Sequence, residues 1–149
     1  MNKKLFLAGL GLVLASGFSG TVLAQAKPEV LVKQRQAAMT LQGKYFGPLA
    51  AMAQGKAPYN AEVAARNAGF LEALSQMPWD GFQASTKEEK SKALPAIYEN
   101  EAKFKEAQNR LKSAVAKLVV AAKDEAAFKG AAGEVGKACG ACHNDFRAK

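Results

Sequence analysis

The sequence predicts an all-α protein, and three observations lead to this fold class. Alanine is abundant, β-branched residues are scarce, and hydrophobic residues recur at spacings of three and four along the chain. No stretch shows the alternation of polar and apolar residues that is typical of a strand. After a hydrophobic N-terminal segment, residues 25–149 have a suitable length for one domain with one core.

Proline, asparagine and glycine delimit the first two predicted helices. Pro28 suits the first turn of a helix, whose hydrophobic pattern continues to the stop at Gln54 and Gly55. Asn60 is expected to cap a second helix that Pro78 ends. The pattern predicts that the faces of these helices contain Leu31, Arg35, Ala38, Gln42, Tyr45, Leu49 and Met52, and then Val63, Asn67, Phe70, Leu71 and Leu74.

Two further helices are predicted after a charged crossover. Residues 79–94 contain Gly81 and the run Lys-Glu-Glu-Lys-Ser-Lys, which is typical of a solvated connection. Pro95 is expected to open the third helix, and Asp124 to cap the fourth. Their predicted faces contain Ile97, Glu101, Phe104, Gln108, Leu111, Val115, Leu118 and Ala122, and then Phe128, Ala132, Val135, Cys139, Cys142 and Phe146.

The fourth predicted helix contains a C-x-x-C-H run that holds both cysteines and the only histidine of the sequence. This run is typical of the attachment site of a c-type haem. Thiols about one helical turn apart can reach the two vinyl groups of the porphyrin, and the imidazole that follows can ligate the iron from one face. We therefore expect one haem c per chain, covalently bound through Cys139 and Cys142, with His143 as an axial iron ligand.

Other interpretations of the two cysteines are less favourable. A thioredoxin-like redox pair belongs near a βαβ pattern, which the sequence lacks. A structural zinc site needs four ligands, whereas the chain has three Cys and His side chains. A disulfide across two residues of a helix would be strained. A chance dithiol stays open as the alternative.

The N-terminus predicts export from the cytoplasm. Lys3 and Lys4 precede a short apolar stretch and then small residues, which is typical of a secretion signal. Cleavage is expected after Ala24, and cleavage after Ala26 is possible, so residues 1–24 form the signal and residues 25–149 the haem domain. An uncleaved anchor is the alternative. Because bacteria attach haem to thiols outside the cytoplasmic membrane, we expect a periplasmic protein without stable membrane insertion once the signal is removed.

Several motifs resemble those of the cytochrome c′ family, the four-helix-bundle class II c-type cytochromes. The resemblance covers essentially the whole of residues 25–149. It implies an antiparallel four-helix bundle with the haem near the C-terminus, a homodimer built largely on the first helix, and five-coordinate high-spin iron that binds NO and CO. The motifs that carry it are Lys27-Pro28-Glu29, Arg35-Gln36 with Met39, residues 55–59, Pro78-Trp79-Asp80-Gly81-Phe82, Phe104-Lys105, and Val135 to His143 with Phe146-Arg147.

The sixth coordination position distinguishes two functions. His143 is the only histidine, so a second axial ligand from this chain is best supplied by methionine, and Met39, Met52 and Met77 are available after signal removal. Met39 falls at the distal position of the family. Our first interpretation is that it packs over the distal face of a five-coordinate iron, which admits NO and CO but hinders oxygen. In the alternative, His143 and Met39 form the low-spin, six-coordinate pair of an electron-transfer cytochrome.

Other residues have a functional and a structural interpretation. Arg35 lies on the core-facing stripe, where a charge needs a partner, and a haem propionate with Gln36 nearby competes with a surface ion pair. Arg147 either influences the proximal face, as the resemblance suggests, or favours the helix C-terminus. Trp79, Phe82, Phe104 and Phe146 pack against the haem or form ordinary core, and Tyr45 and Phe46 could serve a dimer face.

The charge of the chain limits its partners. The formal net charge of +8 falls to about +6 when Lys3 and Lys4 leave with the signal. A basic surface can steer an acidic redox partner, whose identity is unknown. Nucleic acid is a poor candidate, because the charges are dispersed and no binding motif occurs. Without a distal His and Arg pair or an acid-base constellation, no enzymatic activity is expected.

Overall fold

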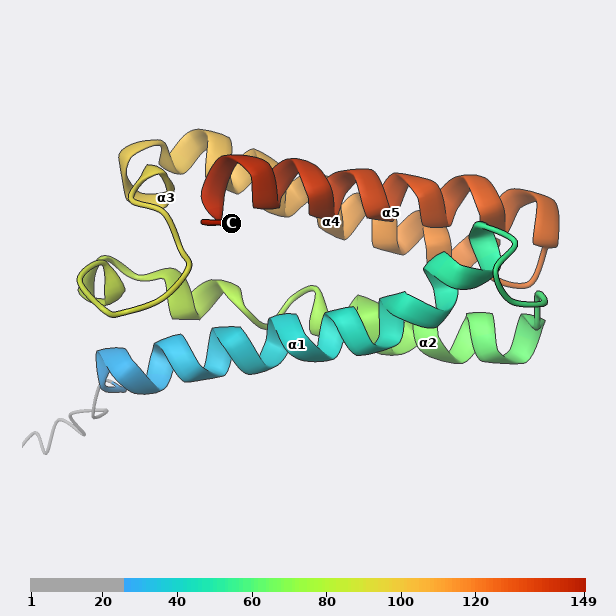
Figure 1. The fold of residues 1–149 in the computed structure, drawn as a ribbon, viewed down its shortest axis with the longest axis horizontal. Helices are drawn as coiled ribbons and strands as arrows, with labels where there is room; N and C mark the ends of the chain where they lie inside the picture. The colour runs from blue at the N-terminus through green and yellow to red at the C-terminus, as the bar shows by residue number, and fades with distance from the viewer. Residues whose placement is uncertain (1–25) are drawn as a thin grey trace, which may run out of the picture.

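The computed structural model describes residues 26–149, and its four long helices form an antiparallel bundle (Figure 1). They are α1 (Pro28–Ala53), α2 (Ala61–Leu74), α4 (Glu101–Ala121) and α5 (Glu125–Phe146), and a short α3 (Ala96–Glu99) precedes α4. Helix α1 packs against α2 and α5, and α4 packs against α2 and α5. Each helix of this ring therefore runs antiparallel to its two neighbours (Figure 1), as the predicted all-α bundle requires.

The helices begin and end at the residues that local chemistry favours. Pro28 lies in the first turn of α1, the side chain of Asn60 accepts the N–H of Val63, and that of Asp124 accepts the N–H of Ala127. Gly55 has a φ of 70° just after α1, a conformation that glycine adopts without strain. These boundaries confirm the predicted caps. Pro48 lies inside α1, and Figure 1 shows the helix bending in its last turns.

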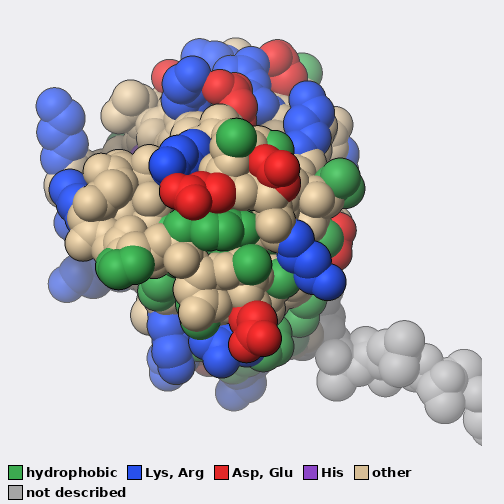
Figure 2. All heavy atoms as spheres, turned by 90° about the vertical axis from the view of Figure 1, so that its right-hand side faces the viewer, with side chains coloured by type: hydrophobic (Ala, Val, Ile, Leu, Met, Phe, Trp, Pro, Cys, Tyr) green, Lys and Arg blue, Asp and Glu red, His purple; other side chains and the backbone are tan. Residues whose placement is uncertain are grey.

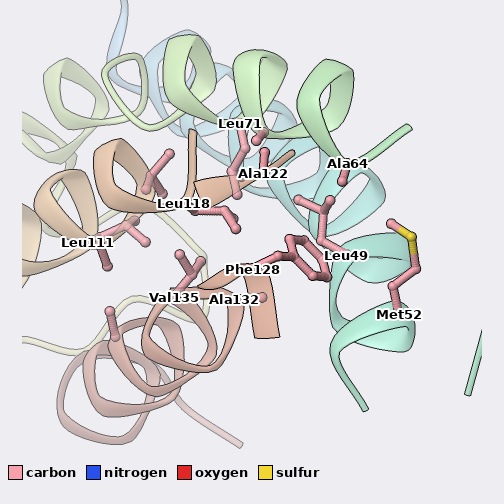
Figure 3. Close-up of a cluster of buried hydrophobic side chains, with 14 residues drawn as sticks. Leu49, Met52, Ala64, Leu71, Leu111, Leu118, Ala122, Phe128, Ala132 and Val135 are labelled. Atoms are coloured by element: carbon pink, nitrogen blue, oxygen red, sulfur yellow. The ribbon is translucent and has the colours of Figure 1, made fainter. Parts of the chain in front are cut away.

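The main hydrophobic core fills the end of the bundle that holds the α1–α2 and α4–α5 connections. Figure 3 shows Phe128 reaching toward Leu49, with Leu118 and Leu71 beside them. Phe128, Leu49, Val115 and Leu118 are fully buried. The hydroxyl of Tyr59 donates to the carbonyl of Ala122 at 2.8 Å, so the two connections are tied together above this core. We call this region the closed end.

The prediction that one continuous helix begins at Pro95 is wrong. The structure instead has α3, a break at Asn100, and then α4. Asn100 leaves the helical conformation with φ −134° and ψ 63°, and its side chain accepts the N–H of Lys103. This cap starts a new helix although the hydrophobic spacing runs on without interruption. Helix α2 also ends at Leu74, four residues before Pro78.

The crossover is less solvated than predicted. Residues 75–95, which we call the connector, contain two short 3₁₀ helices, Trp79–Phe82 and Ala84–Thr86. Thr86 is 1% exposed and Gly81 is buried, although many of the charged residues of the run face solvent. The connector therefore forms part of the interior at the end opposite the closed end.

The charged surface agrees with the dispersed pattern in the sequence. Figure 2 looks onto the closed end and shows Lys and Arg side chains spread around this face with Asp and Glu among them. Two predicted face positions, Phe70 and Glu101, are exposed. Within residues 26–149, no helix is long and apolar enough to cross a membrane. The predicted signal, residues 1–24, lies outside the described residues.

Candidate haem site

A cavity of about 550 Å³ opens between the connector, α1, α4 and α5, within the range typical of small-molecule sites. It contains ten of the eleven site residues that the sequence predicts; the exception, Cys139, packs against the core of the closed end. The ten are Arg35, Gln36, Met39, Trp79, Phe82, Phe104, Cys142, His143, Phe146 and Arg147.

The two cysteines and His143 lie within the last turns of α5, so the helical repeat places the thiols one turn apart. Burial raises the pKa of the Cys139 thiol. Burial, and then the nearby Cys139 and Asp145, raise the pKa of Cys142 to about 11. Both thiols are therefore protonated at neutral pH, unlike the low-pKa thiolates of redox enzymes. Their environment fits thiols awaiting attachment better than a catalytic dithiol.

His143 is held in the form that can ligate iron. Partial burial of the imidazole, followed by the positive charge of Arg147, lowers the pKa of His143. A neutral imidazole keeps a lone pair on one ring nitrogen, which is what a metal ligand needs. The backbone N–H of Arg147 donates to the carbonyl of His143 at 3.2 Å, which places Arg147 one turn after the histidine. The cavity therefore has one nitrogen ligand, contributed by α5.

Aromatic rings line the wall that α4, α5 and the connector share. Phe104 is the centre of this cluster: its ring centroid lies 5.1 Å from that of Phe82, 5.2 Å from that of Phe146 and 6.1 Å from that of Trp79. The indole N–H of Trp79 donates to the carbonyl of Ser75 at 2.7 Å. The polar group of this wall is thereby satisfied, and flat apolar surface is left for a porphyrin.

Arg35 joins α1 to the connector. Its side chain is 3% exposed, and Nη1 donates to the Gly81 carbonyl at 2.6 Å and the Thr86 hydroxyl at 3.0 Å. Nη2 donates to the Ser91 hydroxyl at 2.9 Å, and the guanidinium lies 4.5 Å from the centre of the Phe82 ring. We call this network the Arg35 anchor. The alternative of a surface ion pair is wrong for this buried side chain, and the propionate contact stays a prediction.

Gly81 explains how the connector comes so close to α1. A Cβ built on Gly81 would lie 2.7 Å from the Leu31 carbonyl oxygen and 2.7 Å from Cβ of Arg35. Because the first of these is helix backbone that cannot move aside, only glycine fits this approach. The Arg35 anchor thus depends on a glycine that the sequence analysis assigned only to a solvated connection.

The end of the connector pairs with the residues that follow α5. The N–H of Leu94 donates to the Phe146 carbonyl at 3.0 Å, and the N–H of Ala148 donates to the Lys92 carbonyl at 2.8 Å. Ala93 and Arg147 form an isolated antiparallel bridge between these bonds. We call this pairing the C-terminal bridge. It brings Lys92 and Arg147, far apart in sequence, to the same cavity.

The residues present fit a c-type haem. The cavity combines one imidazole, one attachment thiol with the second one turn away, and an aromatic wall for the porphyrin. Among the described residues that line it are Arg35, Lys92 and Arg147 but no Asp or Glu, which suits a group with two anionic propionates.

Sequence reasoning missed five residues of the cavity wall. Ile97 was on a predicted face but received no role, and Thr40 lies beside Met39 on α1 without any motif. Ser91, Lys92 and Ala93 come from the charged run, which is also the pattern of a solvated loop. The Arg35 anchor places Ser91 there, and the C-terminal bridge, which pairs the end of the connector with the residues after α5, places Lys92 and Ala93. The five are Thr40, Ser91, Lys92, Ala93 and Ile97.

Known proteins of the same kind match almost the entire described chain. The family model for Cytochrome C′ matches residues 30–147. Cytochrome c′ of Rubrivivax gelatinosus is 44% identical over 126 residues, covering 83% of this chain and 98% of that protein. Its crystal structure superposes with a TM-score of 0.78 over 82% of this chain and 98% of that chain, at 43% identity.

A second solved relative is a nitric oxide complex. It is a variant of cytochrome c prime from Alcaligenes xylosoxidans, 39% identical, with a TM-score of 0.77 over 83% of this chain and 98% of that chain. The family model, the identities and the superpositions agree with the haem-binding run and with the antiparallel bundle. This chain belongs to the cytochrome c′ family.

Proposed function

We propose that this chain is a periplasmic c-type haem protein with one haem per chain and five-coordinate high-spin iron that binds NO and CO. The observation that carries the proposal is a cavity lined by His143, the only histidine of the sequence, and by Met39. Such a haem supplies an iron that binds diatomic gases and changes between the ferrous and ferric states. Electron transfer by the same iron is compatible with this role.

The α1 wall explains the proposed selectivity. Met39 is an apolar, flexible side chain, and the hydroxyl of its neighbour Thr40 donates to the Gln36 carbonyl at 2.9 Å, so that donor is already used. An apolar side chain over the iron gives little stabilisation to bound oxygen, which is more polar than bound CO. The nitric oxide complex of the Alcaligenes xylosoxidans relative supports NO as a ligand. Stable oxygen binding by the reduced protein would contradict this proposal.

The alternative function is a six-coordinate, low-spin electron carrier of the same bundle. Met39 favours it, because its thioether lines the same cavity as His143 and is a suitable sixth ligand. In the proposed function Met39 fills volume; in the alternative it closes the site to gases.

Optical spectra of the purified ferric and ferrous protein, with and without CO, separate the two functions. We expect a broad high-spin ferrous Soret band that sharpens with CO, and Met39→Leu should leave the CO-free spectrum unchanged. Sharp α and β bands unmoved by CO, which Met39→Leu converts to a high-spin spectrum, would establish the alternative. Met52→Leu is the matched control, because Met52 is buried at the closed end.

The proposed location rests on the residues that precede the domain. Covalent haem attachment requires the oxidised side of the bacterial membrane, and Lys3, Lys4 and the apolar stretch after them would direct the chain there. Mass spectrometry of the protein from a periplasmic extract should give a chain beginning at Gln25 or Lys27 with one haem added.

We also propose a homodimer through the exposed apolar surface of α1 and α2. Leu41 is 40% exposed and Phe70 46%, and the Tyr45 and Phe70 ring centroids lie 4.9 Å apart. Leu41 is one turn before Tyr45, so these residues form one patch. Leu41→Glu should shift the mass measured by light scattering from dimer to monomer, whereas Val120→Glu, on an 88% exposed position of α4, should not.

A further inference from the structure

We infer that Lys92 binds a propionate of the haem at the mouth of the cavity and thereby raises the reduction potential of the iron. The inference rests on the haem attachment contained in the proposed function. Lys92 is exposed and lines the cavity, at the point where the C-terminal bridge joins the connector to the end of the haem helix. The position of the Lys92 backbone is therefore fixed by pairing between the connector and the residues that follow α5.

The three cations of the cavity are not equivalent. Both terminal nitrogens of Arg35 already donate to connector acceptors, and its side chain is 3% exposed. Arg147 lies one turn after His143, and its charge contributes to the lowered pKa of that imidazole. The Lys92 side chain makes one hydrogen bond to the protein, from Nζ to a main-chain oxygen of Lys149, the last residue of the sequence, at 3.3 Å. An ammonium has three donors, so the Lys92 side chain keeps two for another acceptor.

Charge balance identifies the class of that acceptor. Within residues 26–149, neither Lys92 nor Arg147 forms a salt bridge with an acidic side chain, although lysines elsewhere do, such as Lys103 with Asp145 at 3.0 Å. A covalently attached haem introduces two carboxylates, and a cation at a solvent-exposed cavity mouth can pair with such groups while both stay partly hydrated. Carboxylates of the haem itself are therefore the expected partners.

The contact would act on the iron through charge. A positive charge near the haem stabilises the ferrous form, which carries one positive charge less than the ferric form. Loss of the ammonium would therefore lower the midpoint potential, and it would also remove a hydrogen bond from the propionate. The aromatic cluster and the axial histidine would be unchanged, because none of the hydrogen bonds of Lys92 reaches them.

The test compares Lys92→Gln with Lys90→Gln in the haem-bearing protein. Lys90 is an exposed lysine of the same connector that does not line the cavity, so it controls for general charge. We expect Lys92→Gln to lower the midpoint potential and to shift the propionate bending bands of the resonance Raman spectrum. Lys90→Gln should leave the bands unchanged and lower the potential less. Lys92→Arg should restore both properties.

The outcomes separate this inference from the proposed function. If the purified protein carries no covalently bound haem, the proposed function itself fails. If haem is bound but Lys92→Gln and Lys90→Gln have the same bands and potential, the propionate contact is wrong. A change in the thermal unfolding midpoint of Lys92→Gln with unchanged Raman bands would assign Lys92 to the C-terminal bridge alone, which also overturns the inference.

Discussion

The two ends of the bundle differ in what fills the space between the helices. At the closed end, α1, α2, α4 and α5 fill the interior with Phe128, Leu49 and their neighbours. At the other end, α1, α4 and α5 leave about 550 Å³ open, and the wall is completed by the connector. The closed end is filled by side chains, whereas the other end combines an aromatic cluster and hydrogen bonds with space for a prosthetic group.

This difference indicates that the packed closed end can hold the helices in place around a cavity that side chains do not fill. The closed end provides burial that does not depend on haem, so the helices can be aligned before the cavity is filled. At the opposite end of the bundle, which we call the open end, the polar contacts are concentrated at the buried Arg35 and at the C-terminal bridge. Changes at the two ends should therefore differ in what they alter: global stability at the closed end, and local order and haem properties at the open end.

The largest effect is expected from Phe128→Ala at the closed end. Phe128 is fully buried between α5 and α1, so the change leaves a cavity and should lower the free energy of unfolding by about 3–5 kcal/mol. Urea unfolding followed by circular dichroism measures it, and the haem spectrum should not change. Val120→Ala on exposed α4 is the control. A loss below about 1 kcal/mol would refute the division into two ends.

Arg35→Lys should have the second largest effect, at the open end. A lysine keeps the charge but cannot reach Gly81, Thr86 and Ser91 together, so we expect a loss of about 1.5–3 kcal/mol. Hydrogen exchange should show the loss first in the connector. The matched control is Lys33→Gln, an exposed position on the same helix. Equal loss of protection at the closed end would contradict a local anchor.

Removing both attachment thiols tests what the haem contributes. In the double variant Cys139→Ser with Cys142→Ser, the open end lacks its filling, and amide protection in the connector should fall at least about tenfold, or about 1.4 kcal/mol of local opening. The amides of α5 around Phe128 should keep their protection. Mass spectrometry after hydrogen exchange compares the two. Uniform loss along the chain would mean that both ends need the haem.

The smallest effect is expected from Glu134→Gln, which removes an exposed ion pair on α5. The hydrogen bond and charge of Lys137, 2.8 Å away, lower the pKa of Glu134. A lowered pKa contributes stability above the ordinary pKa of a glutamate and loses it as the pH falls through the lowered value. Both side chains are well exposed, so the thermal midpoints of variant and parent should nearly coincide at pH 7 and still more closely at pH 3. A loss at pH 7 as large as that of Arg35→Lys would contradict this.

Local chemistry made much of this protein predictable. Asn60 and Asp124 cap helix starts by accepting the N–H three residues later, and Pro28 suits a first turn through its fixed φ; the structure confirms all three. Asn100 was missed because the hydrophobic spacing across it is unbroken, although Asn is a common cap. Phe70 was placed on a helix face by its spacing, yet it is exposed. Spacing alone does not say which hydrophobic positions a neighbouring helix covers.

By itself, the sequence determined the all-α fold and most helix boundaries and predicted the haem attachment site, because helical periodicity and the C-x-x-C-H run are local patterns. Only the tertiary structure decided that a charged crossover closes the cavity, that Arg35 anchors it, and that Lys92 lies at the same mouth as Arg147. These depend on contacts between residues about fifty positions apart. A local pattern carries no information about such pairs, since the same lysine in the same run would suit a solvated loop equally well.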